Sequence, residues 1–415
     1  MLTDCNARER PSSNKYRSTV WLPAAASILL VVACLEQQED ERIVIDNDPG
    51  SLSERVDYTN ETVPIDTQGV AAASLRKAPA DSIVLTLVAE VAPPEYDGQV
   101  LQATDVNIKG QKAYVSYNMR GETFLGGVDV FDISDITSPQ LVSSAIFTDT
   151  DVSGLTEQGG ALYLASATER PGFDSPAVLE VVTLKSGLLT DDVSTIDLPS
   201  YAGTDVEVAG NYVYVTSGAD GGVVTVLSTG SLEQQYSFEA DDARGVSADD
   251  QDVGVVAGTP TRLLTFNRNT GNLVHDYILT GATIPFSKST IEINRSKAIL
   301  GVGDGGTQIV CLETGTVIEQ ITQPVVAGLD ASVTVTNAAT TYKKTLFMSN
   351  GEAGVYVALS ETNFDSKGCD VDNLQLVGKF RFDDFQSVNH VAYRSDVLFI
   401  AGGLGGLKIV IVQTD

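Results

Sequence analysis

Short runs of alternating apolar and polar residues recur along the chain from about residue 81 to its end. The clearest copy is TDVEVAGNYVYVTSGADGGVVTVLS at 204–228, in which β-branched residues and tyrosine dominate. A period of two with these residue types, interrupted by Gly, Asn and Asp, predicts β-strands joined by tight turns. Each copy therefore predicts three strands, with a glycine-rich turn before the third.

The pattern occurs seven times, and six copies are followed by a fourth apolar run, such as QLVSSAIF at 140–147. The seventh copy, from Asn389, lacks this run because the chain stops at Asp415. A suitable strand, SIVLTLVAEV at 82–91, precedes the first copy instead. A ring of sheets has no open seam if this N-terminal strand completes the last sheet. The sequence therefore predicts an all-β fold, a seven-bladed β-propeller over 81–415 with 3+1 closure.

The amino-acid sequence of the copies resembles the LVIVD-repeat family of β-propeller lipoproteins. The residues that carry this resemblance are the Thr-Asp-Val starts at 104–106 and 204–206, GGVDVFDIS at 126–134 and GGLKIVIV at 405–412. It covers about residues 82–415, although Arg244 and Thr290 replace the leading Asp in two copies. The resemblance implies the fold and a location in the cell envelope, and it brings no catalytic residues with it.

The N-terminus has the features of a bacterial lipoprotein signal. A region with Arg8, Arg10, Lys15 and Arg17 precedes an uncharged stretch at 19–33, which is too short for a comfortable membrane span. The stretch ends in Val-Val-Ala-Cys, similar to a lipobox, in which the cysteine receives lipid. We therefore expect a signal peptide over 1–33 and a membrane anchor on Cys34, with an ordinary signal as the alternative. Leu35, rather than Asp, favours the outer membrane, with the body periplasmic or surface-exposed.

Composition predicts a disordered tether and argues against nucleic acid as a partner. Residues 34–80 are acidic, rich in Ser, Thr and Pro, and without sustained apolar period, which predicts a disordered tether. The formal charge of −29 argues against nucleic acid, whose phosphates need clustered Lys and Arg. Beyond the signal and Cys34, only Cys311 and Cys369 remain. A disulfide between them is left open, since one lies in a strand pattern and the other in a loop.

Propeller topology places the start of each inner strand on the same face as the turn between the second and third strands. We call this face the mouth face, since it surrounds the mouth of the central channel. The leading residues of the copies should form a ring there: Asp105, Asp151, Asp205, Arg244, Thr290, Ser332 and His390. Two roles are open for the three aspartates. They could accept backbone N–H bonds from turns, or they could hold a cation, for which calcium is the candidate cofactor.

Two turns on the mouth face are long, at 117–127 and 166–177, and both carry aromatic residues and an arginine. Long turns on a repeat scaffold commonly carry binding specificity. The sequence therefore predicts a ligand face over the first two blades, unless the loops merely pack on each other. Its candidate residues, with two from the ring, are Tyr117, Arg120, Phe124, Arg170, Phe173, Arg244 and His390.

Two functions remain open. The chain lacks a serine nucleophile elbow and a phosphate loop, and His390 is a better acid–base candidate than His275, which lies in an outer strand. We expect a non-catalytic binding or scaffold module for a protein, peptide or glycan. The alternative is a calcium-assisted hydrolase or lactonase with its site at the channel mouth. Carboxylates converging on one ion would indicate the enzyme, whereas exposed aromatic loops would indicate the binding module.

Overall fold

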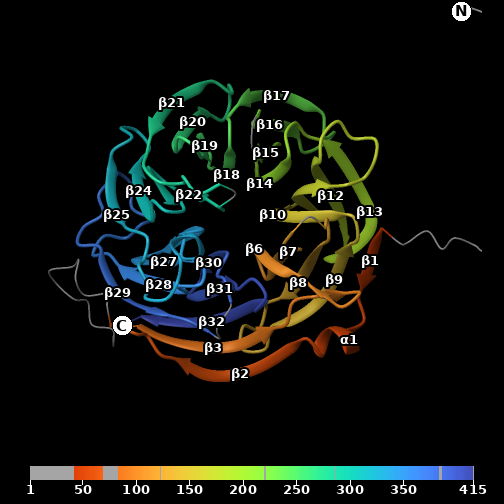
Figure 1. Cartoon of the computed structure of the whole chain (residues 1–415), viewed down its shortest axis with the longest axis horizontal. Coiled ribbons are helices and arrows are strands. Elements are labelled where there is room, and N and C mark those ends of the chain that lie inside the picture. The colour runs from red at the N-terminus through yellow and green to blue at the C-terminus, as the bar shows by residue number, and fades with distance from the viewer. Residues whose placement is uncertain are drawn as a thin grey trace, which may run out of the picture. The chain divides into compact units, whose positions relative to one another are not determined.

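The computed structural model describes residues 42–68, 83–121, 123–218, 221–285, 287–382 and 386–414. These residues form seven antiparallel sheets of four or five strands around a central axis (Figure 1). The predicted all-β, seven-bladed propeller is therefore confirmed. The expected signal peptide and Cys34 lie outside the described residues.

Each blade begins with its innermost strand. Blade 1 contains β6 (Gln102–Lys109), β7 (Lys112–Asn118), β8 (Gly126–Asp132) and β9 (Gln140–Phe147). Blade 2 contains β10 (Thr150–Gln158), β11 (Ala161–Thr168), β12 (Ala177–Lys185) and β13 (Leu188–Asp197). Blade 3 contains β14 (Ala202–Ala209), β15 (Tyr212–Gly218), β16 (Val223–Ser228) and β17 (Gln234–Glu239). Blade 4 contains β18 (Ala243–Ala248), β19 (Asp252–Ala257), β20 (Arg262–Asn267) and β21 (Leu273–Ile278).

Blade 5 contains β22 (Thr290–Asn294), β23 (Lys297–Gly301), β24 (Thr307–Cys311) and β25 (Val317–Ile321). Blade 6 contains β26 (Ala338–Tyr342), β27 (Thr345–Ser349), β28 (Val355–Leu359) and β29 (Gln375–Phe380). Blade 7 contains β30 (His390–Arg394), β31 (Val397–Ala401), β32 (Leu407–Thr414) and β3 (Ile83–Val91). A small hairpin, β4 (Glu95–Tyr96) with β5 (Gln99–Val100), and a short helix, η2 (Ala331–Val333), lie in connections.

The ring is closed by a strand from the N-terminal side of the chain. Strand β3 runs antiparallel to β32, with Ile83 opposite Thr414 and Val91 opposite Leu407. Blade 7 thus takes three strands from the end of the chain and one from before blade 1, which is the 3+1 arrangement expected from the sequence. Main-chain pairing across this seam leaves no unpaired edge between the last and the first blade.

The expectation of a disordered tether is wrong for residues 42–68. Strand β1 (Ile43–Asp46) pairs with β9 as a fifth strand of blade 1, and β2 (Val56–Val63) pairs with β3 as a fifth strand of blade 7. Helix α1 (Pro49–Ser53) joins them, and its Leu52 is 1% exposed. Ordering this polar segment is favourable because its main chain pairs with two outer strand edges that would otherwise be open.

Arg55, directly after α1, fastens this segment to the propeller. Its guanidinium makes two hydrogen bonds to the Asp129 carboxylate, at 3.0 and 2.5 Å, and also donates to Ala92 O. The Asp129 side chain is fully buried, so its charge needs this partner. Tyr117 lies against the same pair, completely buried.

Apolar side chains fill the spaces between neighbouring blades. Tyr214 and Val226 of blade 3, for example, share one cluster with Val246 and Leu264 of blade 4. A disulfide joins Cys311 of blade 5 to Cys369 in the long β28–β29 loop of blade 6, which decides the pairing that the sequence left open. Among the described residues, no helix has the length and apolarity to cross a bilayer.

Candidate functional site

The Thr-Asp signature of the repeat bonds one blade to the next. In blade 1, the hydroxyl of Thr104 donates to Val152 O at 2.9 Å, and Asp105 Oδ2 accepts from Leu155 N at 3.1 Å. Both partners belong to β10, the inner strand of blade 2. Thr104 and Asp105 thus bind the neighbouring strand at two positions: the hydroxyl donates a hydrogen bond to a carbonyl, and the carboxylate accepts one from an N–H group. We call this arrangement an inter-blade clip.

Blade 3 contains the same clip. The Thr204 hydroxyl donates to Ala243 O and the Asp205 carboxylate accepts from Val246 N, each at 2.9 Å, and both partners lie on β18 of blade 4. Burial, followed by the negative charge of Asp105, raises the pKa of Asp205 to about 7. The N–H groups of Val246 and Val206 and the charge of Lys288 offset only part of this rise.

In blade 7 the corresponding pair is Asn389 and His390. Asn389 Nδ2 donates to Ala103 O at 2.8 Å, and His390 Nδ1 lies 2.9 Å from Asp105 Oδ1. Val106 N also approaches Nδ1, at 3.4 Å. The shorter contact assigns the Nδ1 proton to the bond with Asp105, because one nitrogen cannot donate and accept along both directions at once. Asp105 consequently joins blades 7, 1 and 2.

Lys288 brings a positive charge to this group. It leaves the connection between blades 4 and 5 and spans the channel mouth, so that Nζ donates to Thr104 O at 2.7 Å and lies 3.8 Å from Asp105 Oδ1. Burial alone would raise the pKa of Asp105. The charges of His390 and Lys288, with hydrogen bonds from His390 and Leu155, outweigh burial and hold this pKa below its usual value.

Below the mouth, the inner strands line a cavity of about 260 Å³. Glu207 of β14 faces this cavity, where burial and then the nearby Asp205 raise its pKa to about 8. Glu292 of β22 is also in the lining, but its carboxylate accepts from both Thr340 and Thr341 of blade 6. Most polar groups of the channel thus connect neighbouring blades.

Asp151 does not belong to the ring, contrary to the sequence alignment of the copies. The residue of blade 2 that is level with Asp105 and Asp205 is Gly154, as the positions after each inner-strand bulge show. A Cβ on Gly154 would lie 3.1 Å from Asp205 Oδ1, so the Asp205 side chain occupies the space that a clip from blade 2 would need. Asp151 instead accepts from Met119 N and Leu125 N, and burial raises its pKa to about 6.

The three aspartates therefore do not converge on one point. In the described part of the chain, no three His, Cys, Asp or Glu side chains are grouped so that they could hold a metal ion. Asp105, Asp151 and Asp205 each accept backbone N–H bonds, which is the structural role that the sequence allowed. The donor set that calcium prefers, several carboxylate and carbonyl oxygens around one position, is not assembled from them.

Three of the expected ligand-binding residues have structural roles instead. Tyr117 is completely buried beside Asp129. The guanidinium of Arg244 is bidentate to Asp242, at 3.0 and 2.6 Å, and also donates to Ser287 O. Arg170 bonds the buried Glu180 at 2.5 Å. The sequence could not exclude these residues from the ligand site, because the residue type does not show whether a loop arginine bonds within the protein or with a ligand.

Arg120, Phe124 and Phe173 lie at the mouth face as expected. Arg120 is exposed, and the two phenylalanines are partly exposed. The guanidinium of Arg170 covers the Phe173 ring, 4.9 Å from its centre. Tyr201, which the sequence analysis did not select, is 60% exposed on the connection from blade 2 to blade 3. Its position in a short polar connection was the only available signal.

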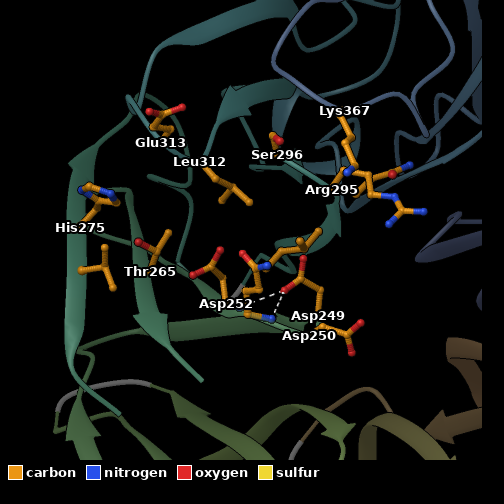
Figure 2. A pocket seen from close by; sticks show the side chains of 14 residues that line it. Asp249, Asp250, Asp252, Thr265, His275, Arg295, Ser296, Leu312, Glu313 and Lys367 are labelled. Atoms are coloured by element: carbon orange, nitrogen blue, oxygen red, sulfur yellow. Dashed lines mark hydrogen bonds between the residues drawn. The ribbon is translucent and has the colours of Figure 1, made fainter. Parts of the chain in front are cut away.

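A second concave region lies between blades 4 and 5, at the end of the blades opposite the mouth face (Figure 2). This groove has a volume of about 730 Å³. Among its acidic residues, Asp249 and Asp250 lie in the β18–β19 turn, Asp252 begins β19, and Glu313 lies between β24 and β25. Arg295 comes from the β22–β23 turn and Lys367 from the β28–β29 loop. Sequence reasoning missed the groove because three separate segments build it. The acidic run at 249–252 was the visible signal.

Comparison with known proteins adds little to these observations. No family model and no curated protein matches the chain. It is similar in structure to the computationally designed Ika8 protein, at 14% identity and a TM-score of 0.47, over 85% of this chain and 100% of that one. It is also similar to BamB from Moraxella catarrhalis, at 13% identity and a TM-score of 0.46, over 86% of this chain and 99% of that one. Neither likeness indicates a function.

Proposed function

We propose that this chain is an outer-membrane lipoprotein whose propeller is a non-catalytic binding or scaffold module. It receives a protein, peptide or glycan on the mouth face, over blades 1 and 2. The lipid on Cys34 would attach it to the membrane, with the body in the periplasm or on the cell surface. The lipobox-like sequence before Cys34 and the resemblance to LVIVD repeats support the location.

The observation that carries this proposal is the way the loop at 119–125 is held. Asp151 Oδ1 accepts from the N–H groups of Met119 and Leu125, the two ends of the loop, at 3.3 and 3.1 Å. The ends are thus fixed together, while Arg120 stays exposed and Phe124 partly exposed. A loop whose ends are held together before binding loses less conformational entropy on association, so its cation and ring are well suited to contact a partner.

One observation favours the alternative, an enzyme. An aspartate at Nδ1 of a histidine is the arrangement that orients a general base, and Asp105 and His390 have it at 2.9 Å. The same contact closes the ring between blades 7 and 1, and this structural role alone would explain why Asp105 and His390 lie together. His390→Gln separates the two roles, since it should lower stability in either case but abolish turnover only in an enzyme.

Site-specific photocrosslinking in cells tests the binding module. A crosslinking residue at Arg120 or Phe173 should capture one discrete partner, whereas the same residue at Asp192, exposed on the outer strand of blade 2, should not. The proposed site is wrong if position 192 captures the partner and positions 120 and 173 do not. Cys34→Ala should move the protein from the membrane to the soluble envelope fraction, and unchanged membrane association would overturn the anchor.

A further inference from the structure

We propose that the groove between blades 4 and 5 is a separate ligand site for a short peptide that carries one positive and one negative charge. The cationic group lies against Asp249 and Asp252, and the carboxylate lies against Arg295 and Lys367. The site is at the opposite end of the blades from the mouth face, so it does not depend on the partner proposed there.

The groove has the size and lining of a small-ligand site. Its volume of about 730 Å³ lies within the range of roughly 300 to 1,000 Å³ that is usual for such sites. Val274, Ile293 and Leu312 supply apolar surface, and the rest of the lining includes charged side chains of both signs. A ligand with an apolar body and charged ends matches this distribution.

The acidic side of the groove is ordered and short of positive charge. Asp249 Oδ1 accepts from the N–H groups of Gln251 and Asp252, at 2.7 and 2.9 Å, which fixes the turn (Figure 2). The Asp252 carboxylate makes no hydrogen bond or ion pair with another described residue. Burial, with the charge of Asp249, raises its pKa, so a ligand cation would relieve an existing electrostatic cost. Among the described residues, Asp250 forms an ion pair with Arg268 at 3.6 Å, and His275 lowers the pKa of Asp252 only in part.

The basic side is ordered as well, by an unusual use of a buried lysine. Lys297 is fully buried, and its Nζ donates to Ser366 O at 2.8 Å and to Gly368 O at 2.9 Å, one residue on each side of Lys367. The disulfide at Cys369 fixes the next residue of the same loop. The blade 6 loop is therefore attached to blade 5 where it carries Lys367 to the groove.

Arg295 and Lys367 have no carboxylate partner among the described residues. Two cations placed on ordered backbone, without an internal partner, are suited to a carboxylate from outside, and guanidinium binds that group in a bidentate manner. Both side chains are exposed, so a ligand carboxylate can reach them from solvent without displacing an internal partner.

An unpartnered hydroxyl gives an independent indication of a ligand. Thr265 of β20 lines the groove, is 2% exposed, and its Oγ1 has no hydrogen-bond partner in the part of the chain that the structure describes. A buried hydroxyl without a partner costs about 1 to 3 kcal/mol, so such groups usually receive a partner from water or ligand. A peptide amide or carbonyl in the groove would supply it.

A peptide fits these groups better than a single ion does. A metal ion or a simple cation would satisfy Asp249 and Asp252 but would leave Arg295, Lys367 and Thr265 unchanged. An inorganic anion would satisfy Arg295 and Lys367 but would leave Asp249 and Asp252 without a cation. A peptide supplies a cation, a carboxylate, main-chain polar groups and apolar side chains together.

Calorimetric titration of the full chain with three matched peptides tests the proposal. The probes are acetyl-Lys-Val-Leu with a free carboxylate, the same peptide as its C-terminal amide, and the analogue with norleucine in place of lysine. The first should bind saturably, and each of the other two should bind about tenfold more weakly, equivalent to ~1.4 kcal/mol. Absence of saturable binding by the first peptide, or equal binding of all three, overturns the proposal.

Variants of the protein test which residues contact the lysine of the peptide and which contact its carboxylate. Asp252→Asn should remove the preference for lysine over norleucine and keep the preference for carboxylate over amide. Arg295→Gln with Lys367→Gln should do the opposite, and Thr265→Val should weaken all three peptides alike. Asp192→Asn, on blade 2, is the matched control and should bind as the wild type does. If Asp252→Asn and the double variant change the two preferences equally, or not at all, the assignment is wrong.

Discussion

His390 of blade 7 and Asp105 of blade 1 lie 2.9 Å apart, from Nδ1 to Oδ1, and this contact joins the last blade of the ring to the first on the channel side. The β3–β32 pairing joins the same seam through the main chain, and Arg55 with Asp129 attaches the outer segment of residues 42–68 to blade 1. The seam is thus closed at the channel, within the sheet and at the outer edge. Residues that the sequence offered as site candidates take part in this closure.

Asp105→Asn is expected to lower the free energy of unfolding by about 2 to 4 kcal/mol. The substitution removes a buried negative charge and leaves His390 and Lys288 without their partner. Urea denaturation followed by tyrosine fluorescence or circular dichroism measures the effect. Asp192→Asn, an exposed change on β13, should stay within about 0.5 kcal/mol of the wild type. An equal loss of unfolding free energy in both variants would contradict a stabilising role of the Asp105 contacts.

The Asp105 contribution should disappear in acid. Its pKa in the folded state lies below the unfolded value of about 3.9, so the folded state binds this proton less readily than the unfolded chain does. The resulting stability is complete above the unfolded pKa and is lost as the pH falls through the folded pKa. The difference between wild type and Asp105→Asn, measured from pH 6 down to pH 2, should therefore shrink. A difference that stays constant would contradict the ion pair.

Glu207→Gln is expected to stabilise the protein in mildly alkaline solution. The folded state keeps the Glu207 proton up to a pKa of about 8, whereas the unfolded chain releases it near 4. The contribution of this group to stability therefore falls as the pH rises from about 4 to 8. The variant should gain about 1 to 3 kcal/mol over the wild type at pH 9 and little at pH 4. Parallel stability curves for the two proteins would show that the channel carboxyl titrates normally.

Arg55→Ala is expected to cost about 3 to 5 kcal/mol, because it leaves the fully buried Asp129 carboxylate without its cation. The segment of residues 42–68 should become accessible first, since Arg55 adds a side-chain contact with blade 1 to the β1–β9 pairing. Limited proteolysis and hydrogen exchange of that segment measure the release. Lys185→Ala, an exposed change at the end of β12, serves as the control. Unchanged protection of residues 42–68 in Arg55→Ala would contradict this role.

Replacing both Cys311 and Cys369 by Ala is expected to lower stability by roughly 2 to 4 kcal/mol, given a separation of 58 residues. Addition of a reducing agent to the wild type should have the same effect, and none on the double variant. Thermal denaturation with and without reductant makes the comparison. A wild-type melting temperature that does not respond to complete reduction, confirmed by thiol counting, would contradict it.

The sequence determined the architecture because strand periodicity is local and was repeated seven times. Alternating side chains and turn residues needed no knowledge of distant contacts, and the absence of a fourth strand after Asn389 led directly to residues 82–91. The prediction failed at residues 42–68, where the strands have weak apolar alternation. Their order comes from two strand edges that exist only once the ring is built.

Only the tertiary structure decided the roles of the polar residues. Asp105, Asp151 and Asp205 begin similar motifs, yet two form inter-blade clips and the third holds a loop. The reason is that Asp105 and Asp205 directly follow the bulge of their inner strand, whereas Asp151 precedes the bulge of β10. The sequence shows the acidic run of the groove with Asp252 and Lys367, but the groove itself exists only in the folded chain, since three blades contribute to it. Residue type fixes what a side chain can bond, but the partner is set by distances between segments far apart in the chain, and only the folded ring fixes those distances.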